Sequence, residues 1–104
     1  MNNKKTMTRQ EYNLKIFEQL RNNRFFNNFM ERNMSNEVYE VLRDCIQDFP
    51  EQRFGQIFCN YVYPTYRDRD VMELNQVIDM LFYGSTCSDP FYEESKETFQ
   101  RLVR

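Results

Sequence analysis

Apolar side chains repeat at helical spacing through most of the chain, and this pattern constrains the fold more than any other feature of the sequence. In the clearest segment the apolar residues stand at i, i+3, i+4, i+7 and i+8, namely Phe54, Ile57, Phe58, Tyr61 and Val62. Such spacing is typical of a helix with one buried face. No pair of alternating segments is joined by a convincing hairpin turn. The sequence therefore predicts an all-α fold.

The apolar stripes divide the chain into five or six short helices, which we expect to pack as one small bundle. A chain of 104 residues has the size of a single domain. We therefore assign one helical domain to 8–104 and a disordered tail to 1–7. The expected helices lie over 9–22, 24–32, 36–48, 51–62 and 70–83, with a last helix close to the C-terminus.

Capping and helix-breaking residues predict where several of these helices begin and end. Thr8 and Glu11 form the capping-box pattern ahead of the first helix. Pro50 ends the helix before it and suits the first turn of the helix after it. Gly84 is placed to stop the fifth helix, because glycine readily adopts the left-handed conformation at that position.

Two boundaries stay open at this stage. The segment 24–32 is either a separate helix or a continuation of the first one, since its several Asn residues lower helix propensity. The last helix begins either directly at Asp89–Pro90 or only at Ser95, and its apolar face is expected to consist of Phe99, Leu102 and Val103.

The residue types that are missing exclude several kinds of site. The chain has no His, which excludes Ser-His-Asp and Cys-His nucleophiles and His-ligated metals. With two Gly residues, no phosphate-cradling loop is recognisable. Cys45, Cys59 and Cys87 show neither disulfide nor zinc-site spacing, and we expect the first two to be small buried hydrophobes. We therefore predict a protein with no cofactor and no metal that is not an enzyme.

An enzyme that uses carboxylates alone is the least favoured alternative. Neighbouring acidic residues are available at Glu93 and Glu94 and at Asp68 and Asp70, and general acid–base chemistry needs only two carboxyl groups. Acidic pairs in surface turns are usually solvated, so these pairs do not by themselves indicate catalysis.

The sequence also predicts where the protein resides. The polar start of the chain has no apolar h-region after it. No apolar run approaches the ~20 residues that a membrane-spanning helix needs. The odd number of cysteines, three, also argues against a disulfide framework. We therefore expect a reduced, cytoplasmic protein of a bacterial host cell.

Charge is distributed unevenly, which raises nucleic-acid binding as an alternative function. Residues 1–34 contain seven Lys and Arg against three Asp and Glu, whereas 35–104 contain seven against thirteen, for a net charge of −2. A basic segment with interleaved aromatic residues is a common phosphate-binding pattern. The candidate phosphate contacts are Lys4, Lys5, Arg9, Lys15, Arg21 and Arg24.

The preferred interpretation is a protein-binding module. The chain contains ten Phe and seven Tyr, too many large rings for all of them to be buried in so small a domain. Tyr, Phe, Met and Arg are also enriched in protein interfaces. The candidate partner-binding residues are Tyr63, Tyr66 and Arg67, in the connector after the fourth helix. We expect a protein partner, and a homo-oligomer stays open.

Two motifs carry a resemblance. The string Pro-x-x-Arg-Phe-Gly-Gln at 50–56 and the later Asp-Pro-Phe/Tyr-x-x-Glu segment at 89–94 resemble those of a group of small bacterial and phage or prophage proteins. The match covers 46–102, with 63–70 resembling an insertion, and its positions are Arg53, Phe54, Gly55, Gln56, Asp89, Pro90, Phe91 and Glu94. The resemblance implies a phage-type protein that binds and modulates or inhibits a bacterial protein, such as a defence protein.

The two motifs also hold complementary polar groups. We expect Arg53 to make a charge-assisted bond to Asp89, Glu93 or Glu94, or to backbone carbonyls of the 85–90 loop. Gly55 would let that loop pass close over the fourth helix. On this hypothesis both Arg53→Ala and Gly55→Leu lower the melting temperature.

Overall fold

The computed structural model describes residues 6–24, 27–28, 37–62, 64, 79, 81–85 and 92–103. Within this part of the chain the fold is all-α, as predicted, and contains no strand. Its elements are α1 (Arg9–Asn22), α3 (Glu37–Asp48), α4 (Phe54–Ile57), the π-helix η1 (Phe58–Val62) and α7 (Ser95–Leu102). These are four α-helices, so the five or six that the sequence predicts are not all seen in the described residues.

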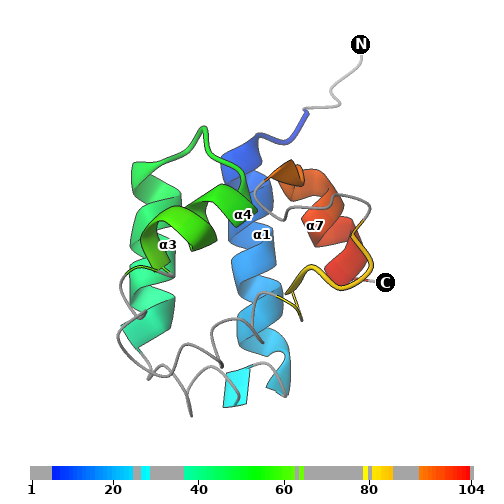
Figure 1. Cartoon of the computed structure of the whole chain (residues 1–104), viewed down its shortest axis with the longest axis horizontal. Helices are drawn as coiled ribbons and strands as arrows, with labels where there is room; N and C mark the ends of the chain where they lie inside the picture. Colours follow the sequence, from blue (N-terminus) through cyan, green and yellow to red (C-terminus); the bar gives the residue numbers. More distant parts are fainter. Residues whose placement is uncertain are drawn as a thin grey trace.

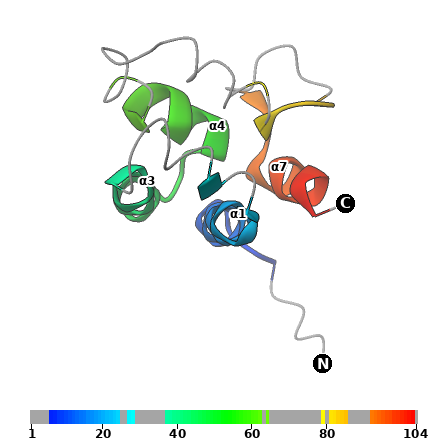
Figure 2. The same ribbon diagram turned by 90° about the horizontal axis from the view of Figure 1, so that it is seen from below.

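Helix α1 is the central element of the arrangement. It packs against α7 on one side and against α3 on the other. Helix α4 contacts α3 and α7, and η1 continues from α4 along α3. Seen along α1, the elements α3, α4 and α7 surround one side of it (Figure 2). The segment between α3 and α4 lies at the same end of the molecule as the beginning of α1 (Figure 1).

The first helix has the bounds that its sequence predicts. The Thr8 hydroxyl accepts a hydrogen bond from the Glu11 backbone N–H at 3.1 Å, and the Glu11 carboxylate accepts one from the Thr8 N–H at 3.1 Å. This reciprocal capping box satisfies two amides that the helix itself cannot use. Helix α3 likewise lies within one residue of the predicted 36–48.

The prediction of one continuous helix over 51–62 is wrong. Residues 50–52 form a turn instead, closed by a hydrogen bond from the Gln52 N–H to the Phe49 carbonyl at 3.2 Å. Arg53 is extended, and the Gln56 side chain accepts its N–H at 2.8 Å. Only four residues of α4 follow before the chain widens into η1. The apolar stripe of this segment is still buried as predicted, with Phe54, Ile57, Phe58 and Val62 in the core. The turn before it is held by the polar contacts described below.

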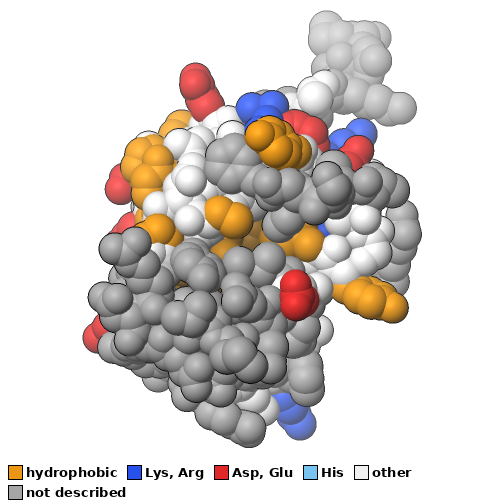
Figure 3. All heavy atoms as spheres, viewed as in Figure 1, with side chains coloured by type: hydrophobic (Ala, Val, Ile, Leu, Met, Phe, Trp, Pro, Cys, Tyr) orange, Lys and Arg blue, Asp and Glu red, His pale blue; other side chains and the backbone are white. Residues whose placement is uncertain are grey.

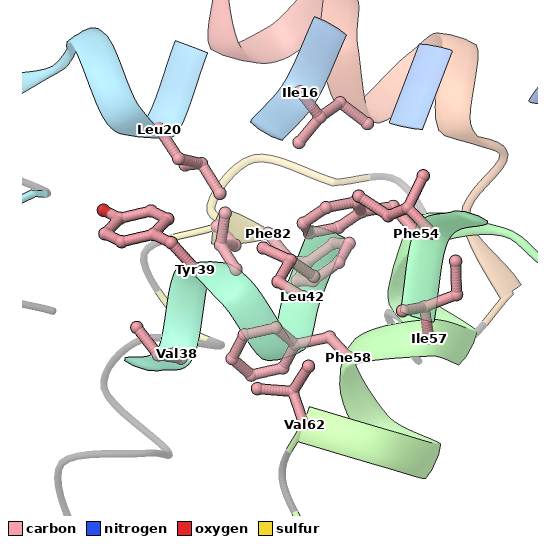
Figure 4. Packing of buried hydrophobic residues seen from close by; sticks show 12 residues of the cluster. Ile16, Leu20, Val38, Tyr39, Leu42, Phe54, Ile57, Phe58, Val62 and Phe82 are labelled. Carbon is pink, nitrogen blue, oxygen red and sulfur yellow. The ribbon is translucent and has the colours of Figure 1, made fainter. Parts of the chain in front are cut away.

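The core forms where α1, α3, α4 and η1 meet (Figure 4). Most of the predicted apolar stripes contribute to it, and its fully buried members include Ile16, Leu20, Val38, Leu42, Ile46, Phe54, Ile57, Phe58, Val62 and Leu81. In a π-helix the backbone hydrogen bonds span five residues instead of the four of an α-helix. Phe58 and Val62 are both buried there, while Tyr61 stacks flat on Phe49 with ring centroids 4.1 Å apart.

Three side chains are less buried than their pattern predicts. Val103 is exposed and lies outside α7, which ends at Leu102 with Val103 as its C-cap. Cys45 and Cys59 are half-buried rather than buried. Phe99 and Leu102 pack against the core from its edge, as expected for the apolar face of the last helix.

The remaining predicted boundaries are settled only in part. Helix α7 begins at Ser95, and Glu94 rather than Ser95 is its N-cap. Gly84 adopts φ +83°, the left-handed conformation expected of a glycine that stops a helix. Most residues of the predicted helices at 24–32 and 70–83 lie outside the described residues. None of the helices described here is long and apolar enough to cross a membrane.

Truncation of a core ring tests this packing. Phe58→Ala should lower the free energy of unfolding by about 3–5 kcal/mol, because it removes a buried ring and leaves a cavity. Urea denaturation monitored by circular dichroism measures this change. Asn60→Ala, at an exposed position of the same π-helix, is the matched control and should stay within about 0.5 kcal/mol of the parent. Equal effects of the two changes would contradict the packing.

Candidate functional site

A buried group of hydrogen bonds joins the turn before α4 to α1 and α7. The Ser95 hydroxyl accepts a bond from the Phe54 N–H at 3.1 Å and donates one to the Asn13 Oδ1 at 2.5 Å. The Asn13 Nδ2 in turn donates to the Gln52 carbonyl at 2.9 Å. Asn13 and Ser95 are both fully buried. We call these residues, Asn13, Gln52, Phe54 and Ser95, the polar junction.

Ion pairs lie at the surface beside the polar junction. The Arg9 guanidinium donates to both carboxylate oxygens of Glu94, at 3.1 and 3.2 Å, and to the Glu51 carbonyl at 2.9 Å. Arg53 also approaches Glu94, but its Nη1 lies 3.9 Å from the carboxylate. The principal partner of Glu94 is therefore Arg9, a residue that the sequence hypothesis had placed among the phosphate contacts.

A second buried polar group lies at the other side of α7. The Glu93 carboxylate is 1% exposed and accepts hydrogen bonds from Ser85 and Thr98, each at 2.6 Å. Arg101 donates to both of its oxygens. The same guanidinium donates to the carbonyls of Leu81 and Tyr83, both at 3.0 Å. Both carboxylate oxygens of Glu93 and all three guanidinium nitrogens of Arg101 thus have hydrogen-bond partners, which a stable buried ion pair requires.

The surroundings of Glu93 shift its pKa. Burial alone would raise it, but hydrogen bonds from Arg101, Ser85 and Thr98 and the charge of Arg101 outweigh burial, so the pKa of Glu93 is lowered. Glu93 is therefore charged at neutral pH. A general acid needs a raised pKa, so Glu93 does not have the properties of a catalytic acid.

The thiol of Cys45 is not activated. Burial raises its pKa, and the charges of Asp48 and Asp44 raise it further. A nucleophilic cysteine needs the opposite environment, with nearby positive charge. Within the described ranges, no three Cys, Asp or Glu side chains gather where a metal ion would bind.

The positions at which the two motifs match have different roles in the structure. Phe54 and Gly55 are buried, Gln56 caps the start of α4, and Arg53 approaches Glu94. Asp89, Pro90 and Phe91 lie outside the described residues, as do the candidate partner-binding residues Tyr63, Tyr66 and Arg67.

The candidate phosphate contacts do not share one environment. Arg9 is held by Glu94 and Glu51 as described above. Lys15 and Arg21 are exposed on α1, and Arg24, also exposed, follows the end of that helix. The Arg21 guanidinium lies over the Tyr39 ring, 5.0 Å from its centroid. Lys4 and Lys5 lie outside the described residues.

The described surface has large exposed hydrophobic side chains near the Glu93–Arg101 pair. Tyr83 is 87% exposed, Tyr92 64% and Val103 46%. Tyr83 gives its carbonyl to Arg101, and Tyr92 directly precedes Glu93. On the face drawn in Figure 3, hydrophobic side chains reach the surface at separate places between charged ones. Elsewhere in the described part, large side chains of this kind are mostly covered.

Sequence reasoning missed the roles of four residues in these networks, namely Asn13, Ser95, Thr98 and Arg101. Asn13 stands on the first helix among apolar positions, at i−3 from Ile16. A polar residue on an apolar stripe is a usable signal, because burial there requires a hydrogen-bond partner. Nothing in the local sequence of Ser95 distinguishes a helix cap from a residue that bonds a distant segment.

Removal of the Ser95 hydroxyl tests the polar junction. Ser95→Ala leaves the buried Phe54 N–H and Asn13 Oδ1 unsatisfied, which should lower the free energy of unfolding by about 1–3 kcal/mol. Chemical denaturation measures it, with the exposed neighbour Lys96→Ala as control. A double change with Asn13→Ala should cost less than the sum of the single changes, since both act on one network. Strict additivity would exclude the coupling.

The buried Glu93 carboxylate predicts how the stability of the fold changes at acidic pH. Because the folded pKa of Glu93 is lowered, its contribution to stability is present above the ordinary value of 4.5 and is lost as the pH falls below it. Glu93→Gln should lower stability at pH 7 by about 3–5 kcal/mol, because Arg101 keeps a buried charge, and should flatten the acid limb of the stability curve.

The neighbouring Glu94→Gln provides the contrast, since the Glu94 side chain is 44% exposed. Its cost at pH 7 should be about 0.2–1 kcal/mol, the usual worth of a surface ion pair. Thermal unfolding measured from pH 7 to pH 3 compares both variants with the parent. Parallel pH curves for Glu93→Gln and the parent would show that Glu93 is not the acid-sensitive group.

Comparison of the chain with family models, with curated proteins and with solved structures finds no match. The resemblance drawn from the two motifs therefore stays a prediction.

Proposed function

We propose that the chain is a non-enzymatic protein-binding module of the phage type, which binds a bacterial protein and modulates or inhibits it. The observation that carries the proposal is the exposure of Tyr83 and Tyr92. Tyrosine offers a large amphipathic surface with few rotatable bonds and is enriched among the residues that dominate binding energy.

The backbone that presents these two side chains is held by hydrogen bonds from α7 and the residues around it. Arg101 donates to the Tyr83 carbonyl at 3.0 Å, and Glu93, next to Tyr92, accepts from Ser85, Thr98 and Arg101. A surface ordered before binding loses less conformational entropy when the partner arrives. The Glu93–Arg101 pair thus supports binding by fixing the positions of the neighbouring tyrosines.

The phage-type version of this proposal rests on the motif resemblance, not on the exposed tyrosines. Tyr63, Tyr66 and Arg67 remain candidate contacts on the same proposal. The nucleic-acid alternative has less support, because Arg9 is neutralised by Glu94 and α3 presents exposed carboxylates at Glu37 and Glu40. A carboxylate enzyme has still less, since the pKa of Glu93 is lowered.

Site-specific photocrosslinking in bacterial extract tests the proposal. A photoreactive phenylalanine at 83 or 92 should give one adduct of the same mass from both positions. The same residue at 40 or 60, exposed positions on α3 and η1, should give little of it. Mass spectrometry identifies the bound protein, and titration calorimetry with the purified partner then measures the affinity.

With that partner, Tyr83→Ser should raise the dissociation constant by about tenfold or more, as expected for an interface residue that carries ~2 kcal/mol. Tyr83→Phe should stay close to the parent, and the melting temperatures of both variants should not change. Equal adducts at all four positions, or unchanged affinity of Tyr83→Ser, would refute binding through these tyrosines. Salt-dependent retention of the parent on DNA or RNA, lost on charge reversal at Lys15 and Arg21, would favour the alternative.

A further inference from the structure

A small cavity opens at the turn between α3 and α4. Its lining consists of Asp48, Phe49, Pro50, Glu51 and Gln52, and its volume is about 240 Å³. Pockets for drug-sized ligands usually measure ~300–1,000 Å³, so this one has the size for a single long side chain. Phe49 supplies an aromatic wall that Tyr61 supports by flat stacking at 4.1 Å.

The side chains around this cavity present hydrogen-bond acceptors. Asp48 and Glu51 are exposed carboxylates, and neither forms an ion pair with another residue in the described ranges. The Gln52 Oε1 is buried and accepts no hydrogen bond from any described group. The amide nitrogen of the same side chain is already engaged, since it donates to the Tyr61 hydroxyl at 3.0 Å.

The nearest cations are directed elsewhere. Arg9 donates from Nη1 to the Glu51 carbonyl, and its Nε and Nη2 donate to Glu94. Arg53 lies within ion-pair distance of Glu94 as well. Among the described residues, no cation therefore pairs with the two carboxylates beside this aromatic ring, and the Gln52 Oε1, which is closed to solvent in this conformation, has no hydrogen-bond donor.

We propose that this cavity receives an arginine side chain of the partner protein. A guanidinium has five N–H donors in one plane, which suits several acceptors around a flat aromatic wall. An ammonium group is a more strongly hydrated point charge and fits such a site less well. The charge of the site and the donors of the ligand are complementary, and this complementarity identifies the occupant.

The inference deepens the proposed function and rests on it, because it states what the partner brings to this end of the molecule. The cavity and the beginning of α7 lie on either side of Arg9, which bonds both Glu51 and Glu94. Figure 1 shows this end of the bundle, where the α3–α4 segment and the first turns of α1 and α7 converge. One partner surface can therefore contact both the cavity and the beginning of α7.

The test uses N-acetyl-arginine methylamide as the probe and needs no partner protein. Titration into ¹⁵N-labelled protein, followed by two-dimensional NMR, should give saturable shifts of the backbone amides around 48–52, with a dissociation constant in the millimolar range. The citrulline derivative has nearly the same shape without the charge and should give no saturable shifts. The lysine derivative should bind more weakly.

Paired substitutions provide the matched control. The double variant Asp48→Asn/Glu51→Gln should weaken arginine binding by roughly five- to tenfold, the worth of two exposed ion pairs. Glu37→Gln/Glu40→Gln removes the same charge from exposed positions of α3 away from the cavity and should leave the affinity within about twofold.

Equal shifts with citrulline, shifts confined to other residues, or no effect of the first double variant would overturn the proposal. Equal binding of the lysine derivative would overturn the assignment to arginine in favour of any cation. These outcomes are separable from a failure of the proposed function, because that failure is read from the photocrosslinks at 83 and 92 and not from the probe.

Discussion

One buried hydroxyl holds the helices of this protein in their arrangement. The Ser95 side chain at the beginning of α7 bonds Asn13 of α1 and the first amide of α4. Because α4 has only four residues, it cannot be stable by its own hydrogen bonds. Its position comes from the polar junction on one side and from the burial of Phe54 and Ile57 on the other. The core and the junction thus stabilise each other.

The sequence predicts the parts of the fold that local chemistry decides. The capping box of Thr8 and Glu11 places the start of α1, and the stripe of Val38, Leu42 and Ile46 places α3. The π-helix after α4 escapes prediction, because its apolar residues fit a regular helix equally well. The start of α4 at Phe54 also escapes prediction, because it depends on a contact with a segment far away in the chain, the bond of the Phe54 N–H to Ser95.

Two adjacent carboxylates show that local sequence also does not predict the contacts of the candidate site. Glu93 and Glu94 are indistinguishable as sequence, yet one is buried against Arg101 and the other is half-exposed beside Arg9. Residue type indicates that a buried or half-buried acid will pair with a cation. The hypothesis that Arg53 bonds one of the acids at 89–94 rests on that rule alone. Which acid meets which cation depends on how the residues before α7 pack against α1 and against the 81–85 segment, and local pattern does not determine that packing.

The bonds from Arg101 to the carbonyls of Leu81 and Tyr83 have a consequence for how the protein opens. Among the described residues, the 81–85 segment has a backbone hydrogen bond from the Ser85 N–H to the Phe82 carbonyl, and the Arg101 side chain ties two further carbonyls of this segment to α7. Segments joined in this way exchange their amide protons together, as one cooperative unit. We therefore expect the backbone that carries Tyr83 to unfold together with the last helix.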